Sequence, residues 1–409
     1  MKKAMTSMLA AMVLAGVFAL YGCGGGDNRG TVKIIGSNVT IEEAVTDKII
    51  KQIKKEAGDK DLNFSLQKMD DIKEIEKFCD AYPGVKQLTV KAGKNLTSIA
   101  PLAKLKSLTR LYVDGDSIAD FSPLKDLTAL SSLSIDSKAM GSDLKWMSGL
   151  TNLQTINIQA GDKLVSFEGI PSLPALNSIT LKNAAPADLS PLKALPGLKT
   201  IDFMNAKIAD LTPLAELHRL EKLNLYGATV KDFSPLAKCA ALKELNFYAT
   251  KNADYSTLGK LTQLHVLEGG LTSLDDISWI SKLTNLKKYT MFAEKVKDYT
   301  PLSKLKLEEF MIWSMNVEGP NLSFISGMTS LRKLTLDTLN GVTNLKALQS
   351  LTSLKTLKIT KINDKGGESI PLDVIKKLPN LEDLTITKGT FTDDQLKGFA
   401  NSGIKISQW

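Results

Sequence analysis

Apolar residues recur along this chain with a fixed period. From Leu198 to Gln263, three consecutive blocks of 22 residues align as LKTIDFMNAKIADLTPLAELHR, LEKLNLYGATVKDFSPLAKCAA and LKELNFYATKNADYSTLGKLTQ. Each block begins with alternating apolar and polar positions, which is the pattern of a strand with one buried face. A turn and the sequence Asp-x-Ser/Thr-Pro/Thr-Leu follow, which we interpret as a short helical return. This pattern predicts the strand-and-return coil of a leucine-rich-repeat solenoid.

The same register extends over most of the chain. The predicted strand-start residues are Val85, Leu108, Leu130, Leu153, Leu176, Leu198, Leu220, Leu242, Leu264, Leu286, Leu307, Leu331, Leu354 and Leu381. The predicted fold is therefore an α/β leucine-rich-repeat solenoid, with a curved parallel sheet and short helical returns over residues 85–403. Residues 404–409 are expected to add a closing strand, and residues 365–368 are an insertion beside the final turns.

Residues 31–84 precede the first repeat, and their pattern predicts strand, helix, strand, helix. Thr40 begins a capping-box sequence, so the first helix is expected to start there and to end near Gly58. The second helix is expected to begin at Asp70 or Asp71. Its predicted inward residues are Ile72, Ile75 and Phe78. Because a repeat stack exposes an apolar end, we interpret this segment as a helical N-terminal cap; a separate functional domain is the alternative.

Each return carries a signal for the start of a helix. In the block from Leu220, Ser234 is suited to the N-cap, and Pro235 is suited to the first helical position, where its missing N–H costs nothing. The same pair recurs at Ser122-Pro123, Ser190-Pro191, Thr212-Pro213 and Thr300-Pro301.

The fixed register also predicts which strand residues point outward. The third outward position, six residues after each strand start, is polar towards both ends of the array and apolar in the middle. Its central members, the aromatic column, are Met204, Tyr226, Tyr248, Gly270, Phe292 and Trp313. Neighbouring strands lie ~4.8 Å apart, so we expect the rings to form one continuous exposed patch. Exposed apolar patches with aromatic anchors usually mark interaction sites, and we interpret the column as partner-binding.

A polar rim is predicted beside the aromatic column. Its members are Asn224, Asn246, Glu268 and Glu309, together with Asp202, Lys222, Glu244 and Lys288. Gly269 and Gly270 are expected to leave a notch that admits a partner side chain. Under the alternative interpretation, the column packs on itself or under adjacent loops and serves only strand formation. A glycan ligand also stays open, because aromatic platforms hold sugars.

Residues 85–384 resemble the internalin-like leucine-rich repeats of bacterial surface proteins, most specifically in the Asp-x-Ser/Thr-Pro-Leu returns. The resemblance implies a curved array whose concave face grips a protein or peptide partner. The family usually has Asn in the turn after the strand, where this chain has Asp116, Ala206, Ala228 and Thr250. We therefore expect backbone or water to satisfy these turns. The competing hypothesis is a structural, envelope-scaffold lipoprotein that faces the periplasm.

Residues 1–22 resemble the signal peptide of a bacterial lipoprotein. Lys2 and Lys3 precede an apolar run that ends at Gly22, and a Gly-rich tether over residues 23–30 follows. The resemblance implies that Cys23 is acylated, with palmitate-type chains that anchor the protein to the membrane of the bacterial cell envelope. Gly24 implies the outer membrane if the organism has two. An ordinary secretory signal or an uncleaved anchor is the alternative.

The composition and net charge of the chain limit the classes of partner that we expect. The chain is 43% hydrophobic and 23% charged, as soluble globular chains are. Its net charge of +8 is spread without a dense basic block, so we expect no nucleic-acid partner. Cys79 and Cys239 occupy inward positions seven repeats apart, which is too far for a disulfide, and both are expected to be buried.

No enzymatic signature stands out. His218 and His265 lack a Cys, His or Ser partner at a fixed register offset. Asp275 and Asp276 are interpreted as solvated acids of a return rather than a cation site, and no phosphate-binding Gly loop is found. The sequence therefore predicts a non-enzymatic binding module without catalytic residues, metal or cofactor.

Overall fold

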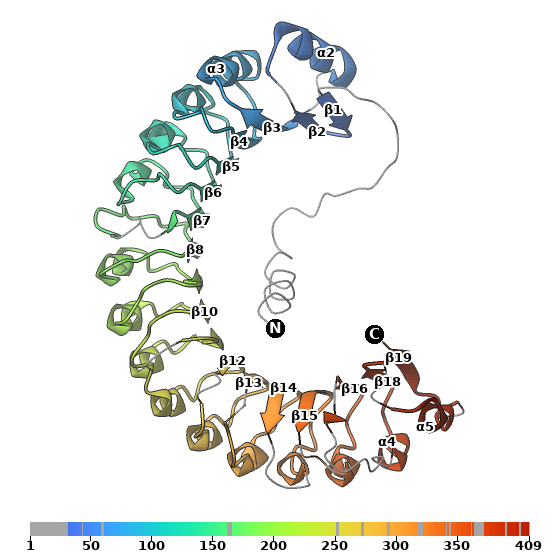
Figure 1. Ribbon diagram of the computed structural model, residues 1–409. Helices are drawn as coiled ribbons and strands as arrows, with labels where there is room; N and C mark the ends of the chain where they lie inside the picture. The colour runs from blue at the N-terminus through green and yellow to red at the C-terminus, as the bar shows by residue number, and fades with distance from the viewer. Residues whose placement is uncertain are drawn as a thin grey trace.

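The protein is an open arc with strands along its inner side and returns along its outer side (Figure 1). The structure, a computed structural model, describes residues 32–408 except 43, 59–60, 162–165, 251–252, 271–273, 293–294, 317–321, 341, 343–344, 361, 364–371, 389–390 and 401. The predicted leader, Cys23, the tether and the insertion at residues 365–368 lie outside the described residues. Within the described residues, no helix is both long and apolar enough to cross a bilayer.

One sheet of 19 strands runs through the described chain. From β2 to β16 each strand pairs in parallel with the next, one repeat further along. These strands include β4 (Gln87–Ala92), β5 (Arg110–Asp114), β6 (Ser132–Asp136), β7 (Thr155–Gln159), β8 (Ser178–Lys182), β9 (Thr200–Asp202), β10 (Lys222–Asn224), β11 (Glu244–Asn246), β12 (Val266–Gly270), β13 (Lys288–Phe292), β14 (Glu309–Asn316), β15 (Lys333–Asn340) and β16 (Thr356–Ile359). The predicted leucine-rich-repeat register is confirmed.

The sheet is extended at both ends. At the C-terminal end β17 (Ile362–Asn363) lies beside β15, β18 (Asp383–Ile386) beside β16, and β19 (Lys405–Gln408) beside β18. At the N-terminal end β1 (Val32–Ile35) forms an antiparallel hairpin with β2 (Asn38–Ile41), and β2 pairs in parallel with β3 (Asn63–Met69). The residues before the first repeat therefore share the sheet of the array.

The first helix starts later than predicted. Thr40 lies in β2, where it pairs with strands on both sides, so it cannot cap a helix. Helix α2 (Asp47–Ala57) begins instead after Thr46, whose Oγ1 accepts from the Ile49 N–H at 3.3 Å, and ends at Gly58 as expected.

The second helix, α3 (Ile72–Ala81), begins as predicted. Asp71 is its N-cap, with Oδ1 2.9 Å from the Lys73 nitrogen. Ile75 and Phe78 are buried, but Ile72 is 39% exposed, so the prediction that it faces inward is wrong. Ile72 is the first residue of the helix and does not belong to the packed core.

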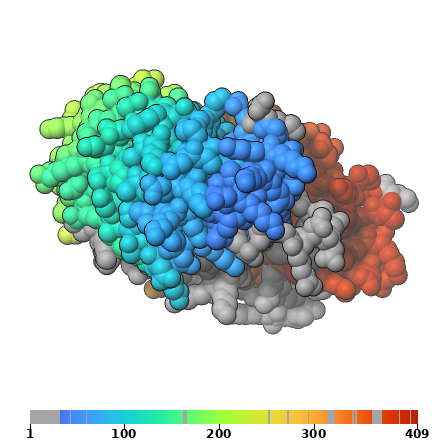
Figure 2. Space-filling view, turned by 90° about the horizontal axis from the view of Figure 1, so that it is seen from above, coloured from blue at the N-terminus to red at the C-terminus, as the bar shows by residue number. Residues whose placement is uncertain are grey.

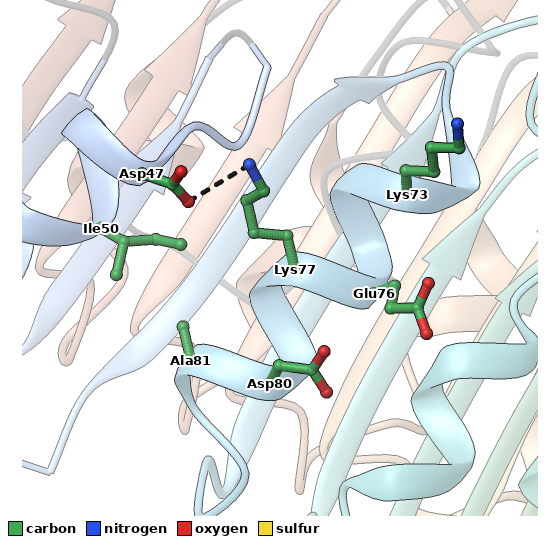
Figure 3. A pocket seen from close by; sticks show the side chains of 7 residues that line it. All are labelled: Asp47, Ile50, Lys73, Glu76, Lys77, Asp80 and Ala81. Atoms are coloured by element: carbon green, nitrogen blue, oxygen red, sulfur yellow. Dashed lines mark ion pairs between the residues drawn. The ribbon is translucent and has the colours of Figure 1, made fainter.

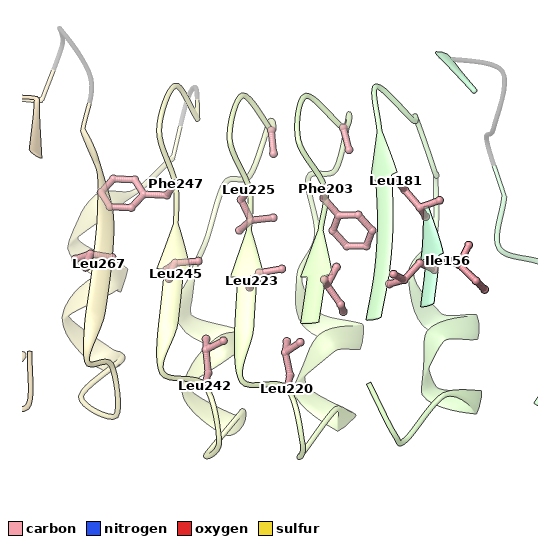
Figure 4. Close-up of a cluster of buried hydrophobic side chains, with 14 of the residues drawn as sticks. Ile156, Leu181, Phe203, Leu220, Leu223, Leu225, Leu242, Leu245, Phe247 and Leu267 are labelled. Carbon is pink, nitrogen blue, oxygen red and sulfur yellow. The ribbon is translucent and has the colours of Figure 1, made fainter. Parts of the chain in front are cut away.

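The inward strand residues and the apolar residues of the returns form one continuous core along the arc (Figure 4). Leucines such as Leu223 and Leu245 pack against their equivalents one repeat away, so each repeat is stabilised by its neighbours rather than alone. Cys79 and Cys239 are buried free thiols, as predicted. Burial raises the pKa of Cys79 to about 12 and that of Cys239 to about 11.

The returns are 3-10 helices in most repeats. They are η1 (Ala100–Lys104), η2 (Ser122–Asp126), η3 (Lys145–Met147), η5 (Ser190–Ala194), η6 (Thr212–Glu216), η7 (Ser234–Lys238), η8 (Tyr255–Lys260), η9 (Ser278–Lys282), η10 (Thr300–Lys304), η11 (Ser323–Ile325) and η12 (Lys346–Ser350), followed by α4 (Asp373–Lys376) and α5 (Asp393–Lys397). Ser234 is not the N-cap that the sequence predicted. The N-cap position is Phe233, whose side chain makes no cap bond. Asp232, one residue earlier, supplies the acceptor instead, because its Oδ1 accepts from the Ser234 N–H at 2.7 Å.

Candidate binding surface on the concave face

The C-terminal half of the aromatic column lies on adjacent strands, as the register predicted. Gly270, Phe292 and Trp313 are directly opposite one another on β12, β13 and β14. The side chains of Phe292 and Trp313 are half-buried. These two rings therefore share the concave face, one strand apart.

The N-terminal half of the column lies on turns rather than strands. β9, β10 and β11 each end two residues before the column, at Asp202, Asn224 and Asn246. Met204 and Tyr226 nevertheless stay in register, because their carbonyl oxygens accept N–H donors from the preceding repeat at 3.0 and 2.6 Å. The carbonyl of Tyr248 accepts from the Gly227 N–H at 2.7 Å. A ladder of backbone bonds thus runs beneath this half of the column.

Three equivalent polar side chains build these turns. Oδ1 of Asp202, of Asn224 and of Asn246 each accepts the N–H of the column residue two positions later, at 3.0 Å in all three cases. Asn224 Nδ2 also donates to Asp202 Oδ1 at 2.9 Å, which ties two repeats together. Asn224 and Asn246, predicted as partner contacts in the polar rim, are therefore also the residues that position Tyr226 and Tyr248.

The turns continue through a left-handed residue in each repeat. Asn205, Gly227 and Ala249 follow the column residues with φ of 57°, 70° and 55°. Glycine and asparagine tolerate this conformation, whereas alanine is strained there. The N–H groups of Ala206 and Ala228 then donate to backbone carbonyls of the same turn at 3.0 Å, as expected. The turns as a whole do not rely on backbone alone, because the side chains of Asp202, Asn224 and Asn246 also accept N–H groups in them.

The column is exposed only in part. Met204, Tyr226, Tyr248, Phe292 and Trp313 are each half-buried, and Gly270 is buried. Desolvation, with smaller contributions from Glu268 and Tyr289, holds the pKa of Tyr248 well above its usual value, so its phenol is enclosed although the residue as a whole is not. The ring pairs found among the described residues join other rings, mostly of the core, and not neighbouring column members. The rings lie in series without stacking.

The predicted notch is filled rather than open. A Cβ on Gly269 would lie 2.2 Å from ring atoms of Phe247, so this phenylalanine occupies the space that the glycine leaves. Gly270 has φ of +146°, and a Cβ there would lie 2.5 Å from the backbone nitrogen of Phe292. Both glycines are thus explained by close approach within the fold.

The charged rim residues are paired across repeats. Lys222 Nζ lies 2.8 Å from Glu244 Oε1, and Lys288 Nζ lies 3.1 Å from Glu268 Oε1. Glu309 is half-buried between Lys288 and Lys333 in the same row of the sheet. Burial raises the pKa of Asp202, although the Met204 N–H, Lys182 and Asn224 oppose this.

Sequence reasoning overlooked the C-terminal continuation of the row that contains Asn224, Asn246 and Glu268. Thr290 and Thr335 are buried there, with Met311 half-buried between them. The fixed register could have identified these residues. Thr290, Met311 and Thr335 lie two positions before Phe292, Trp313 and Asp337, respectively. Together they form a floor of low polarity next to Phe292 and Trp313.

Two aspartates lie side by side on the N-terminal part of the concave face. Asp114 and Asp136 are directly opposite on β5 and β6. Desolvation, followed by Asp114 and Asp116, raises the pKa of Asp136. Desolvation, with Asp114 and Asp136, raises the pKa of Tyr112 to about 12.

Two of the residues considered for catalysis or metal binding, Asp276 and His265, have local structural partners. Asp276 Oδ1 accepts from the Ser278 N–H at 2.7 Å, which confirms it as a return acid. His265 Nδ1 lies 3.0 Å from the backbone oxygen of Gln263. Within the described part of the chain, His, Cys, Asp and Glu form no group of three or more that could hold a metal ion.

Comparison with solved structures identifies the fold. A leucine-rich-repeat protein of Leptospira interrogans has 16% identity and a TM-score of 0.57, over 87% of this chain and 98% of that chain. Toll, in its Drosophila complex with Spatzle, has 15% identity and a TM-score of 0.58, over 94% of this chain and 57% of that one. An internalin of Listeria monocytogenes has 22% identity and a TM-score of 0.46, over 85% of each chain.

The similarities to the Leptospira protein and to Toll establish the leucine-rich-repeat fold of the chain. No protein-family model and no curated protein sequence matches it.

Proposed function

We propose that this protein is a lipid-anchored, non-enzymatic binding module of the bacterial envelope that captures a protein or peptide through the aromatic column. The observation that supports this most is the placement of five large, half-buried side chains on one concave face, within six consecutive repeats interrupted only by Gly270. Side chains needed only for the core would be buried, as Phe203 and Phe247 are.

The column sets the size of the partner. Met204 follows β9 and Trp313 lies on β14, so five strand spacings of ~4.8 Å, or ~24 Å in total, separate them. An elongated apolar element of a protein spans this distance. Because the polar rim is already paired internally, apolar contacts supply most of the binding energy and the rim supplies orientation.

One solved structure of this fold supports protein capture. Toll was solved in complex with Spatzle. The lipoprotein-like leader supports the proposed acylation of Cys23 and the proposed envelope location.

The first prediction tests the column. Tyr226→Ala combined with Trp313→Ala should reduce partner capture from envelope extracts at least tenfold, because truncating buried interface aromatics typically costs about 2 kcal/mol or more each. Capture is measured by quantitative pull-down with purified protein, and circular dichroism verifies the fold.

Tyr112→Ala is the matched control, because Tyr112 is a half-buried aromatic of the same concave face outside the column. It should leave capture unchanged. Equal capture by the double variant and the native protein would remove the column as the binding surface. If added protease fails to cleave the protein on intact cells, the envelope-scaffold hypothesis facing the periplasm is favoured over a surface-exposed binder.

A further inference from the structure

Helix α2 has two faces of opposite character. Ile49, Ile53 and Ala57 are buried in the core, whereas Lys48, Lys51 and Lys55 are exposed. At about 100° per residue these three lysines fall within about 60° of one another, directly opposite the buried face. We call Lys48, Lys51 and Lys55 the lysine face.

The two acidic residues of this helix have other partners. Asp47 is turned towards α3, where its Oδ1 lies 3.2 Å from Lys77 Nζ at the edge of a groove between the two helices (Figure 3). Glu56 accepts a hydrogen bond from Gln52 at 3.1 Å. Within the described residues, no carboxylate forms an ion pair with the lysine face. Its charge is therefore available to an external anion.

The lysine face belongs to the end of the molecule from which the tether leaves. α2 contacts β1, and the blue residues of this end form the surface nearest the viewer in Figure 2. Ile35, the last residue of β1, is 73% exposed, the larger of the two exposed large hydrophobic side chains among the described residues. An apolar side chain thus accompanies the cationic helix at this end.

Chain length limits how far this end can be from a membrane. Nine residue steps separate Cys23 from Val32, the first residue of β1. Fully extended, they span at most about 30 Å. If Cys23 carries the lipid, the start of β1 lies within that distance of the bilayer, and α2, which contacts β1, lies close to it.

We propose that the lysine face docks on the anionic phospholipid headgroups of the membrane that holds the anchor, and that this contact orients the arc. The proposal rests on the lipid anchoring of the proposed function. Acyl chains alone provide attachment without orientation, because the Gly-rich tether is flexible. Each lysine near an anionic bilayer strengthens association about fivefold, and Ile35 adds apolar contact with the interface.

The test uses the full chain in vesicles of phosphatidylcholine, with and without 30% phosphatidylglycerol. Acetylation of lysines by a water-soluble reagent is followed by mass spectrometry of the resulting peptides. Acetylation of Lys48, Lys51 and Lys55 should be at least fivefold slower on the anionic vesicles. The protection should fall as salt is raised to 0.5 M, because screening shortens the range of the attraction. Equal rates on the two vesicles would overturn the proposal.

A triple variant separates the lysine face from general charge. In K48Q/K51Q/K55Q, the protection of the neighbouring Lys54 on anionic vesicles should be lost. K238Q/K260Q/K282Q is the matched control, because it removes the same charge from exposed lysines of η7, η8 and η9. This control variant should retain the protection of Lys54. The proposal is contradicted if both triple variants lose the protection of Lys54, or if neither does.

The acylation of Cys23 is measured independently of lysine protection. The mass of the peptide that contains Cys23 shows whether it is acylated. If Cys23 is not acylated, lysine protection can still be measured with anionic vesicles in excess. An unacylated Cys23 with protected lysines refutes the anchor alone, whereas an acylated Cys23 with unprotected lysines refutes the lysine face alone.

Discussion

Asp202 shows how much one side chain can decide at the edge of the concave face. It occupies the position that Asn224 and Asn246 occupy in the next two repeats, and it makes the same turn with the same oxygen. The difference is its charge, which burial disfavours. The sequence placed these three residues beside the column, but their role in the turn could not be predicted, because it depends on strands that end two residues early.

The second prediction follows from that charge. Asp202→Asn should stabilise the protein at pH 7 by up to about 1 kcal/mol, because the amide oxygen retains both accepted hydrogen bonds without a desolvated carboxylate. Folding raises the pKa of Asp202, so its contribution to stability is fully present below the unfolded value of about 3.9 and is lost as pH rises through the folded value. The advantage of the variant should therefore vanish below about pH 4.

Urea unfolding at pH 7 and at pH 3.5 measures this difference. Asn224→Asp is the reciprocal control, and it should destabilise at pH 7, because it puts two carboxylates on neighbouring turns. The quantity compared is the difference in unfolding free energy between Asp202→Asn and the native protein. If this difference is no larger at pH 7 than at pH 3.5, the carboxylate is well solvated in the turn and the prediction is wrong.

The strands and returns were predictable as elements, because the same register repeats along the array. The residues at which these elements begin and end were not predictable. Ser-Pro and Thr-Pro pairs suggested serine or threonine caps, yet the aspartate two residues earlier accepts the N–H in η2, η5, η6, η7, η9 and η10. Thr40 was likewise assigned to a helix, although pairing with β1 and β3 holds it in β2. In each case a tertiary or neighbouring partner decided between two locally plausible caps.

The third prediction concerns the returns. Asp232→Ala should destabilise the protein by about 1 kcal/mol, because the Ser234 N–H loses its acceptor at the start of η7. Hydrogen bonds from the Ser234 hydroxyl and N–H hold the pKa of Asp232 below its usual value. The stability that this aspartate provides is thus present above its unfolded pKa and is lost as pH falls through the folded one.

Ser234→Ala is the matched change, since it removes only the hydroxyl that donates to Asp232 Oδ2 at 2.6 Å. Thermal unfolding at pH 7 should show the smaller loss for the serine variant. If Ser234→Ala loses more stability than Asp232→Ala, the serine side chain and not the aspartate stabilises the start of η7.

The whole molecule behaves as a stack in which every layer touches only the layers beside it. β9 pairs with β10, and β10 with β11, in identical register. The period of the sequence was sufficient to predict this architecture. It was not sufficient to predict the hairpin at the N-terminal end, where residues 32–41 have no counterpart in the repeats.

The fourth prediction uses this modularity. Deleting residues 220–241, one period of 22 residues, should leave a folded protein, because β9 would then pair with β11 in the register that β10 has now. Deleting only residues 220–230 should prevent folding of the central array, because the strand would be lost while its return remains. Circular dichroism and the hydrodynamic radius distinguish the two outcomes, and equal behaviour of the two deletions would contradict a purely local stack.

The arc is open, and its two end strands, β1 and β19, are joined only through all the strands between them. A tilt at each junction too small to lengthen any single hydrogen bond accumulates along the row and changes the width of the mouth. The separation of β1 and β19 is therefore set by the summed compliance of all the junctions between them, and a substitution at one junction should change it only slightly.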